Sequence, residues 1–203
     1  MASNKVIRSR KTVAYYLTQP AVRLLARTSI APNTISWFGF LVTLGAAALI
    51  ISGHLFAAGL VVLMAGFFDI LDGALARSTN RTTQFGAILD STLDRFSEAV
   101  VLLGILIFYL SNANEPPVIE ALLVILTLIG SFMVSYTRAK AEALGLKGEV
   151  GLFTRAERVI VLALGLLLNQ IDYALITALA IIVVFSFITV SQRLLYVWRQ
   201  TKI

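Results

Sequence analysis

Four aspartates, Asp69, Asp72, Asp90 and Asp94, lie in a part of the chain that is otherwise strongly apolar. The segment VVLMAG precedes them and FSEAVVLLGILIFYL follows them. Ionised carboxylates are costly in such surroundings and repel one another when they are close. Either some of them are protonated, or cations neutralise them. Mg²⁺ commonly takes one or two carboxylates together with substrate phosphates, so these residue types point to metal-assisted phosphoryl chemistry.

The spacing predicts that the four carboxylates form one cluster. Asp69 and Asp72 are three residues apart, and so project from one helix face. Asp90 and Asp94 are four residues apart and do the same. The polar segment STNRTT at 78–83 separates two apolar runs and predicts a helical hairpin. With a rise of about 1.5 Å per residue, all four aspartates lie roughly 9–15 Å from the loop. Asp72 is level with Asp90 on the facing helix. Asp69 is level with Asp94.

Small residues flank these aspartates. Gly73 and Ala76 follow Asp72, and Gly86 lies near the start of the second helix. Glycine is unfavourable in a helix interior unless something must approach closely. That neighbour is either a ligand or another helix, because small residues also allow tight helix packing in membranes. Arg77, at the end of the first helix, either holds a phosphate or extends its charge to the interface.

The composition predicts that membrane helices position these residues. Of the 203 residues, 58% are hydrophobic and 14% are charged, and the mean hydropathy is +0.86. Long continuous apolar runs favour helices over the alternating strands of a barrel. We predict an all-α integral membrane protein that forms one domain over 1–203, with a six-helix core at 31–203. The predicted spans are 34–52, 55–78, 84–110, 117–141, 154–169 and 171–192.

The lysine and arginine residues predict the orientation. All 17 lie in the segments, or the adjoining span ends, that an even number of spans puts on one side. By the positive-inside rule this side, with both termini, is cytoplasmic. The basic segment 4–27 predicts an interfacial amphipathic helix within 1–30, interrupted near Pro20; the alternative is a disordered basic tail.

Other chemistries are excluded by composition. The chain has no cysteine and a single histidine, His54, in a predicted loop. Thiolate and histidine metal sites are therefore excluded. The positive charges are spread over several loops and form no patch for nucleic acid.

Together these residues read Asp69-x2-Asp72-Gly73-x2-Ala76-Arg77-x8-Gly86-x3-Asp90-x3-Asp94. The pattern resembles the signature of the CDP-alcohol phosphatidyltransferases, with every specified position filled. The resemblance implies an enzyme that displaces CMP from a CDP-linked lipid with an alcohol. It also implies two divalent ions per active site, Mg²⁺ or Mn²⁺, and a homodimer in the cell membrane.

The resemblance further implies a role for each matched residue. Asp69, Asp72 and Asp90 would ligate metal. Asp94 would complete the second metal site and act as general base on the acceptor hydroxyl. The stretch APNTIS resembles the family's segment at the start of the first span, with Ser36 where many relatives have threonine. The expected CDP-lipid contacts are Asn33, Thr34, Ile35, Ser36, Gly73, Ala76, Arg77 and Thr83.

Four cations could select the acceptor. Arg138, Lys140, Arg155 and Arg158 lie at span ends on the same predicted side as the aspartates. They suit an acceptor that carries phosphate, although they could also be ordinary positive-inside anchors.

The segment that carries them, SYTRAKAEALGLKGEVGLFTRAERVIV, is similar to that of the prokaryotic phosphatidylinositol phosphate synthases, and LDSTLDR resembles that branch and its archaeal counterparts. This implies inositol 1-phosphate (1D-myo-inositol 3-phosphate) as acceptor, and CDP-diacylglycerol or CDP-archaeol as donor. Relatives that use glycerol phosphate tend to have proline and lysine where this chain has Ser91 and Arg95. Two alternatives stay open: glycerol 3-phosphate as acceptor, giving phosphatidylglycerol phosphate, and a cation channel or proton-coupled transporter. The absence of matching acidic residues in the outer halves of the spans disfavours the transporter.

Overall fold

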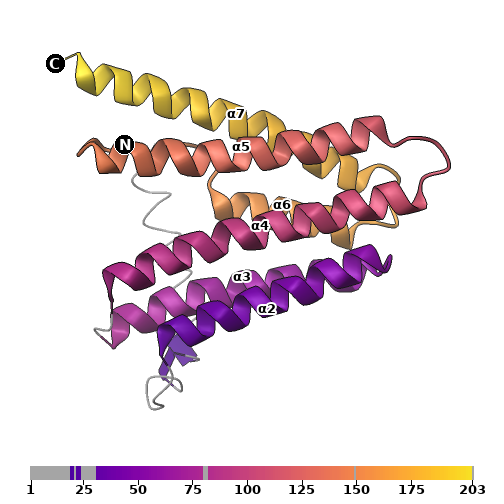
Figure 1. Ribbon diagram of the computed structural model, residues 1–203, viewed down its shortest axis with the longest axis horizontal. Coiled ribbons are helices and arrows are strands. Elements are labelled where there is room, and N and C mark those ends of the chain that lie inside the picture. Colours follow the sequence, from indigo (N-terminus) through magenta and orange to yellow (C-terminus); the bar gives the residue numbers. More distant parts are fainter. Residues whose placement is uncertain (1–18, 21, 24–30, 80–81, 149, 203) are drawn as a thin grey trace. The chain divides into compact units, whose positions relative to one another are not determined.

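The computed structural model describes residues 19–20, 22–23, 31–79, 82–148 and 150–202. Six helices have both ends within this part of the chain, which contains no strand (Figure 1). They are α2 (Pro32–Ile51), α3 (Leu55–Ser78), α4 (Gln84–Asn112), α5 (Val118–Ala143), α6 (Arg155–Leu167) and α7 (Ala174–Thr201). Each coincides with one predicted apolar run, so the all-helical prediction is confirmed. The predicted interfacial helix at 4–27 lies almost entirely outside the described residues.

Four of these helices, α2, α3, α5 and α7, are long and apolar enough to cross a membrane. Helix α4 is longer, but its first half carries the charged residues of the site. Helix α6 has only 13 residues, which span about 20 Å, against about 30 Å for the hydrocarbon core of a bilayer. The described part of the chain therefore contains four candidate membrane spans, judged by length and composition.

Glycines end two of the helices by the same mechanism. Gly53, after α2, has φ 82° and Gly145, after α5, has φ 73°, the left-handed conformation that glycine adopts without steric cost. After α2, the amide of Gly53 donates to the Ile50 carbonyl at 2.9 Å and that of His54 to the Leu49 carbonyl at 2.9 Å. This pair of bonds is a Schellman motif. His54 is exposed in the resulting turn, as the sequence predicts.

Helix α7 ends later than the sequence predicts. The predicted span stops at 192, whereas the helix continues to Thr201. The added segment RLLYVWRQT contains neither glycine nor proline, so nothing in it terminates a helix. A loss of hydrophobicity marks the edge of a membrane, but it does not end the backbone hydrogen-bonding pattern.

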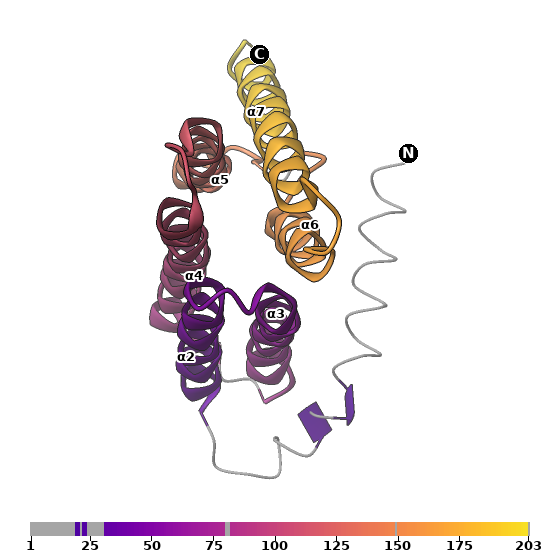
Figure 2. The ribbon, with the colours of Figure 1, turned by 90° about the vertical axis from the view of Figure 1, so that its right-hand side faces the viewer.

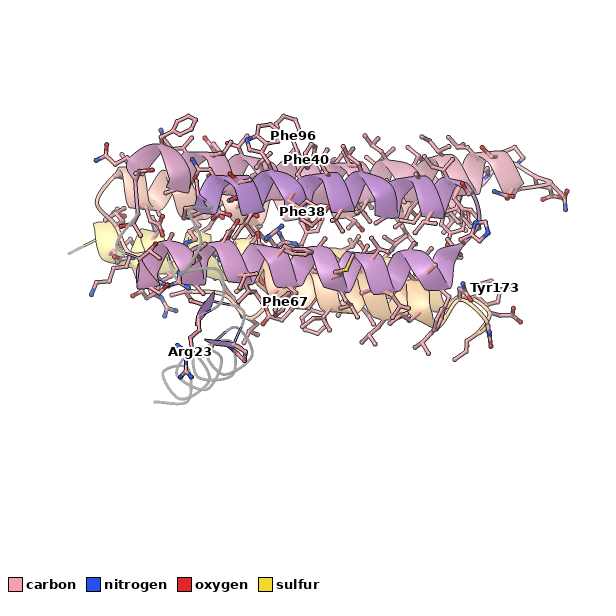
Figure 3. All side chains as sticks on the ribbon, turned by 90° about the horizontal axis from the view of Figure 1, so that it is seen from below. Arg23, Phe38, Phe40, Phe67, Phe96 and Tyr173 are labelled. Atoms are coloured by element: carbon pink, nitrogen blue, oxygen red, sulfur yellow. The ribbon has the colours of Figure 1, made fainter. Side chains whose placement is uncertain are left out.

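The helices divide into two compact units, Met1–Val42 with Met64–Phe96 (unit 1) and Thr43–Leu63 with Ser97–Ile203 (unit 2). In unit 1, Ile35 of α2 packs with Leu71 and Leu75 of α3 in a small buried cluster. The ring of Phe38 meets the ring of Phe68 edge-on, with centroids 5.1 Å apart, and Figure 3 shows Phe38 between the α2 and α3 ribbons.

Unit 2 is held together by close helix contacts. Helices α5 and α7 lie side by side and α6 packs against α7 (Figure 2). Gly165 of α6 is the closest point of the second contact. A Cβ added there would lie 2.6 Å from the Cβ of Ala178 in α7, so only glycine allows this approach. Small residues serve this purpose generally where helices pack in membranes.

Gly165→Ala should therefore lower the thermal unfolding temperature of the purified protein in detergent. Overpacking of this kind typically costs about 1–3 kcal/mol. The matched control is Gly45→Ala in α2, where an added Cβ meets nothing within 4 Å. That variant should unfold at the same temperature or higher, because alanine favours the helix by up to about 1 kcal/mol. Equal behaviour of the two variants would contradict the packing argument.

Candidate functional site

Three of the four aspartates come together in unit 1. Asp69 of α3 and Asp90 and Asp94 of α4 each offer a carboxylate oxygen, and these oxygens all lie within 4.8 Å of one another. All three residues are half-buried. A set of carboxylate oxygens from two helices is the donor set that hard divalent cations prefer.

The periodicity of α3 separates this site from the core. Phe68, Leu71 and Leu75 follow the helical spacing of three and four residues and pack in the unit 1 cluster. The series that begins one residue later runs through Asp69 and Asp72. Since one residue turns a helix by about 100°, the acidic face points away from the apolar face.

The fourth aspartate has a different environment. Asp72 is buried, with 4% of its surface exposed, and the Ser36 hydroxyl of α2 donates to its Oδ2 at 2.5 Å. A hydrogen bond to the charged form of a carboxylate stabilises that form. Ser36 therefore joins α2 to the acidic face of α3.

A cavity of about 160 Å³ opens beside Asp72 and Asp90. All of the residues that line it belong to unit 1: Pro32, Asn33, Ser36, Asp72, Gly73, Ala76, Arg77, Thr82, Thr83, Gly86, Ala87 and Asp90. Six of the eight predicted CDP-lipid contacts are among them. Of the other two, Thr34 is exposed and Ile35 packs in the apolar cluster. Helical geometry explains this, because residues 33 and 36 share a face that 34 and 35 do not.

Three residues of the cavity lining, Pro32, Thr82 and Ala87, were not predicted from the sequence. Ala87 had a signal, because it precedes Asp90 by three residues and so lies on the same face of α4. Pro32 also had one, since proline favours the first position of a helix and so stands next to Asn33. Thr82 had no comparable signal.

Two glycines keep the cavity open. A Cβ on Gly86 would lie 2.9 Å from the Thr83 hydroxyl oxygen and 3.2 Å from Oδ1 of Asn33. The same Thr83 hydroxyl accepts from the Gly86 amide at 2.9 Å and caps the start of α4. A Cβ on Gly73 would lie 3.3 Å from Nη1 of Arg77, so this glycine allows the guanidinium to fold back along α3.

The four predicted acceptor cations lie in unit 2 and differ in environment. Arg138 donates to Glu142 at 2.7 Å on the exposed surface of α5. Lys140 is also exposed, and Arg155 begins α6. Arg158, in contrast, is 2% exposed.

The Arg158 guanidinium is occupied by a buried acidic side chain. Its Nε and Nη2 donate to the two oxygens of Glu98 in α4, at 2.7 and 3.0 Å. Paired bonds of this kind fix both position and orientation. Arg158 therefore ties α6 to α4, a contact that sequence analysis did not foresee.

Arg193 of α7 is a second buried arginine whose role was not predicted from the sequence. This arginine is buried, its Nε donates to the Val150 carbonyl at 2.7 Å, and its Nη1 donates to the Val134 carbonyl. Arg138 and Arg158 are near enough to repel its charge. A lone arginine at the end of an apolar run was the available signal, but it reads equally well as a positive-inside residue.

Removing the Arg158 charge should destabilise the fold. Arg158→Met leaves Glu98 buried without its counter-charge, which typically costs about 3–5 kcal/mol. The double variant Glu98→Gln/Arg158→Met should recover most of this loss, and Arg138→Met, which removes an exposed ion pair, should cost less than about 1 kcal/mol. Thermal unfolding in detergent measures all three. An Arg158→Met protein as stable as the parent would rule out a structural role for the pair.

Comparison with known proteins places these residues in a family. The family model described as CDP-alcohol phosphatidyltransferase matches residues 29–195. A phosphatidylinositol phosphate synthase of Mycobacteroides abscessus is 36% identical over 92% of this chain and 85% of its own length. An archaetidylinositol phosphate synthase of Methanothermobacter thermautotrophicus is 38% identical over 87% of this chain and 87% of its own length.

Solved structures agree with the sequence relatives. The crystal structure of Mycobacterium tuberculosis phosphatidylinositol phosphate synthase with CDP-DAG bound has a TM-score of 0.80 and 34% identity, and the match covers 90% of this chain and 94% of that chain. The structure of the same enzyme in complex with manganese and citrate has a TM-score of 0.79 at 34% identity, covering 89% and 88%. The match spans both the aspartate cluster and the cation-bearing helices, so the chain belongs to the CDP-alcohol phosphatidyltransferase family and is an enzyme of that kind.

Proposed function

We propose that this enzyme transfers a phosphatidyl or archaetidyl group from a CDP-linked lipid to inositol 1-phosphate (1D-myo-inositol 3-phosphate). The products are phosphatidylinositol phosphate, or its archaetidyl equivalent, and CMP. The acceptor hydroxyl oxygen forms a bond to the lipid-bearing phosphorus, and the bond from that phosphorus to the CMP oxygen breaks. The observation that carries the proposal is the cluster of Asp69, Asp90 and Asp94 together with the cavity bordered by Asp72 and Asp90.

The aspartates fit two divalent ions, Mg²⁺ or Mn²⁺. Asp69, Asp72 and Asp90 would ligate metal, and Asp94 would complete the second metal site. When bound, the ions would bind the diphosphate and stabilise the charge that develops on the leaving CMP. A relative that was solved with manganese supports this assignment.

Asp94 is our candidate for the general base. It lies one helical turn beyond Asp90 and is absent from the lining of the cavity. A carboxylate beside the acceptor hydroxyl would take its proton as the new bond forms. Asp72, held by Ser36, would keep a fixed orientation during the reaction.

The cavity in unit 1 would hold the cytidine diphosphate. Asn33 and Ser36 would contact the nucleotide from the start of α2, whereas the other two predicted contacts, Thr34 and Ile35, lie outside the cavity lining. Gly73, Ala76, Arg77 and Thr83 would do so from α3 and the start of α4. The two glycines supply the space, since a Cβ on either would enter it.

The acceptor assignment rests on cations and on relatives. Arg138, Lys140, Arg155 and Arg158 are the predicted contacts for the acceptor phosphate. The Glu98 bond gives Arg158 a second, supporting role. The relatives are a phosphatidylinositol phosphate synthase and an archaetidylinositol phosphate synthase, which favours inositol phosphate over glycerol phosphate as acceptor.

The membrane arrangement is part of the proposal. Six transmembrane helices and an N-terminal interfacial helix would place both termini and the active site on the cytoplasmic side. The whole chain would act as one membrane domain and assemble as a homodimer. Lipid tails of either linkage would stay in the bilayer while the headgroup reacts at the interface.

Purified enzyme with CDP-diacylglycerol and Mg²⁺ should release CMP when inositol 1-phosphate is added. Glycerol 3-phosphate should support little or no release, because the enzyme selects its acceptor by transition-state contacts. CMP is measured directly, with acceptor-free enzyme as the blank and CDP-archaeol as a parallel donor. Release with glycerol 3-phosphate but not with inositol phosphate would overturn the acceptor assignment.

Asp94→Asn should abolish transfer while CDP-lipid binding stays measurable. Loss of a general base typically costs about 10²–10⁴-fold in rate, and the amide removes a carboxylate ligand as well. The matched control is Thr92→Ala, also in α4, whose hydroxyl donates to the Ile88 carbonyl of its own helix at 2.8 Å. It should retain transfer. An Asp94→Asn enzyme with full activity would refute the role of base.

A further inference from the structure

The connection between α5 and α6 is bound by a side chain from the end of α7. The amide nitrogen of Gln200 donates to the Lys147 carbonyl at 3.0 Å. The Lys147 backbone amide donates back to the Gln200 side-chain oxygen at 3.1 Å. A primary amide carries one acceptor and two donors, so a single glutamine satisfies both backbone groups of Lys147. The side-chain amide thus makes the two hydrogen bonds that a neighbouring backbone peptide group would otherwise make.

The same connection also packs closely against α5, at Gly148. Gly148 is buried, and a Cβ added there would lie 3.1 Å from the Arg138 carbonyl oxygen and 3.3 Å from the Arg138 Cα. The residue next to the Gln200 contact therefore rests on the turn of α5 that carries Arg138. Displacement of Lys147 would shift this contact as well.

Helix α7 holds the connection at a second place, just before α6. The Thr189 hydroxyl accepts from the Phe153 amide at 3.2 Å. A Cβ on Gly151, where φ is 145°, would lie 2.5 Å from the Thr189 methyl group, so the chain can pass only as glycine. The start of α6 at Arg155 follows directly. Together with the Arg193 bond to the Val150 carbonyl, these contacts hold the connection to α7 at Lys147, Val150 and Phe153.

We propose that Gln200 is a positioning residue for the acceptor. By holding Lys147, it fixes the connection that joins the turn of Arg138 to the start of α6 at Arg155. This inference rests on the proposed function, in which these two arginines bind the acceptor phosphate. Anion recognition by two cations depends on their separation, so a loose connection would weaken acceptor binding.

Gln200 lies outside the residues that the family model matches. The family match ends at residue 195, and the predicted last span ends at 192. Continuation of α7 to Thr201 is what brings the glutamine to the connection. The clasp, meaning the two hydrogen bonds between Gln200 and Lys147, lies outside the matched residues and adds to the signature residues.

The test compares Gln200→Ala with Thr201→Ala in the full-length enzyme. Thr201 is the adjacent residue, and its hydroxyl bonds to the Trp198 carbonyl of the same helix. Gln200→Ala should raise the KM for inositol 1-phosphate by about five-fold, the effect of one net hydrogen bond. The KM for CDP-diacylglycerol, and kcat at saturating acceptor, should stay at the parent values. Thr201→Ala should match the parent in all three.

Hydrogen exchange without substrates separates this inference from the proposed function. Peptides covering 144–148 should exchange faster in Gln200→Ala than in the parent or Thr201→Ala, because the Lys147 amide has lost its acceptor. If the parent enzyme releases no CMP with inositol 1-phosphate, the acceptor assignment is wrong. The exchange result still tests whether Gln200 holds Lys147. Unchanged exchange would overturn the clasp. Faster exchange with an unchanged acceptor KM would overturn the positioning role, as would equal losses for both substrates.

Discussion

The cost of placing carboxylates among apolar helices governs the arrangement of this enzyme. Unit 1 gathers its acidic side chains where α3 and α4 form a hairpin, so that Asp69, Asp90 and Asp94 share a single site. Their mutual repulsion makes that site a strong attractor for divalent cations. In the proposed reaction, the attraction of this site for a cation and its capacity for phosphoryl chemistry would come from the same electrostatic constraint.

Two other carboxylates, Asp72 and Glu98, are stabilised by hydrogen bonds from side chains of the protein. Asp72 accepts from the Ser36 hydroxyl, and Glu98 accepts two bonds from the Arg158 guanidinium. A hydroxyl leaves the carboxylate charge available to a ligand, whereas a guanidinium neutralises it. This contrast separates a carboxylate of the functional site from one that supports the fold, although both are on helices that are otherwise largely apolar.

Glycine supplies the other requirement, which is space. At Gly165 a close approach joins two helices, and at Gly86 it leaves room next to Asn33 and Thr83. In the sequence, these two residues look the same, because each is a glycine within a predicted helix. Only the neighbours of the missing Cβ distinguish packing from a cavity, and for Gly86 they favour the cavity.

The sequence by itself determined the helices, the acidic hairpin and the family, because each depends on local periodicity or on a short fixed spacing. Asp69 and Asp72 share a face for the same reason that Asp90 and Asp94 do. Tertiary structure alone decided that Arg158 pairs with Glu98 and that Gln200 holds Lys147. The residues of each pair are 60 and 53 positions apart, on separate segments of the chain, and no helical period relates them. Their contact depends on how the helices of unit 2 pack, which the spacing of residues along one helix does not encode.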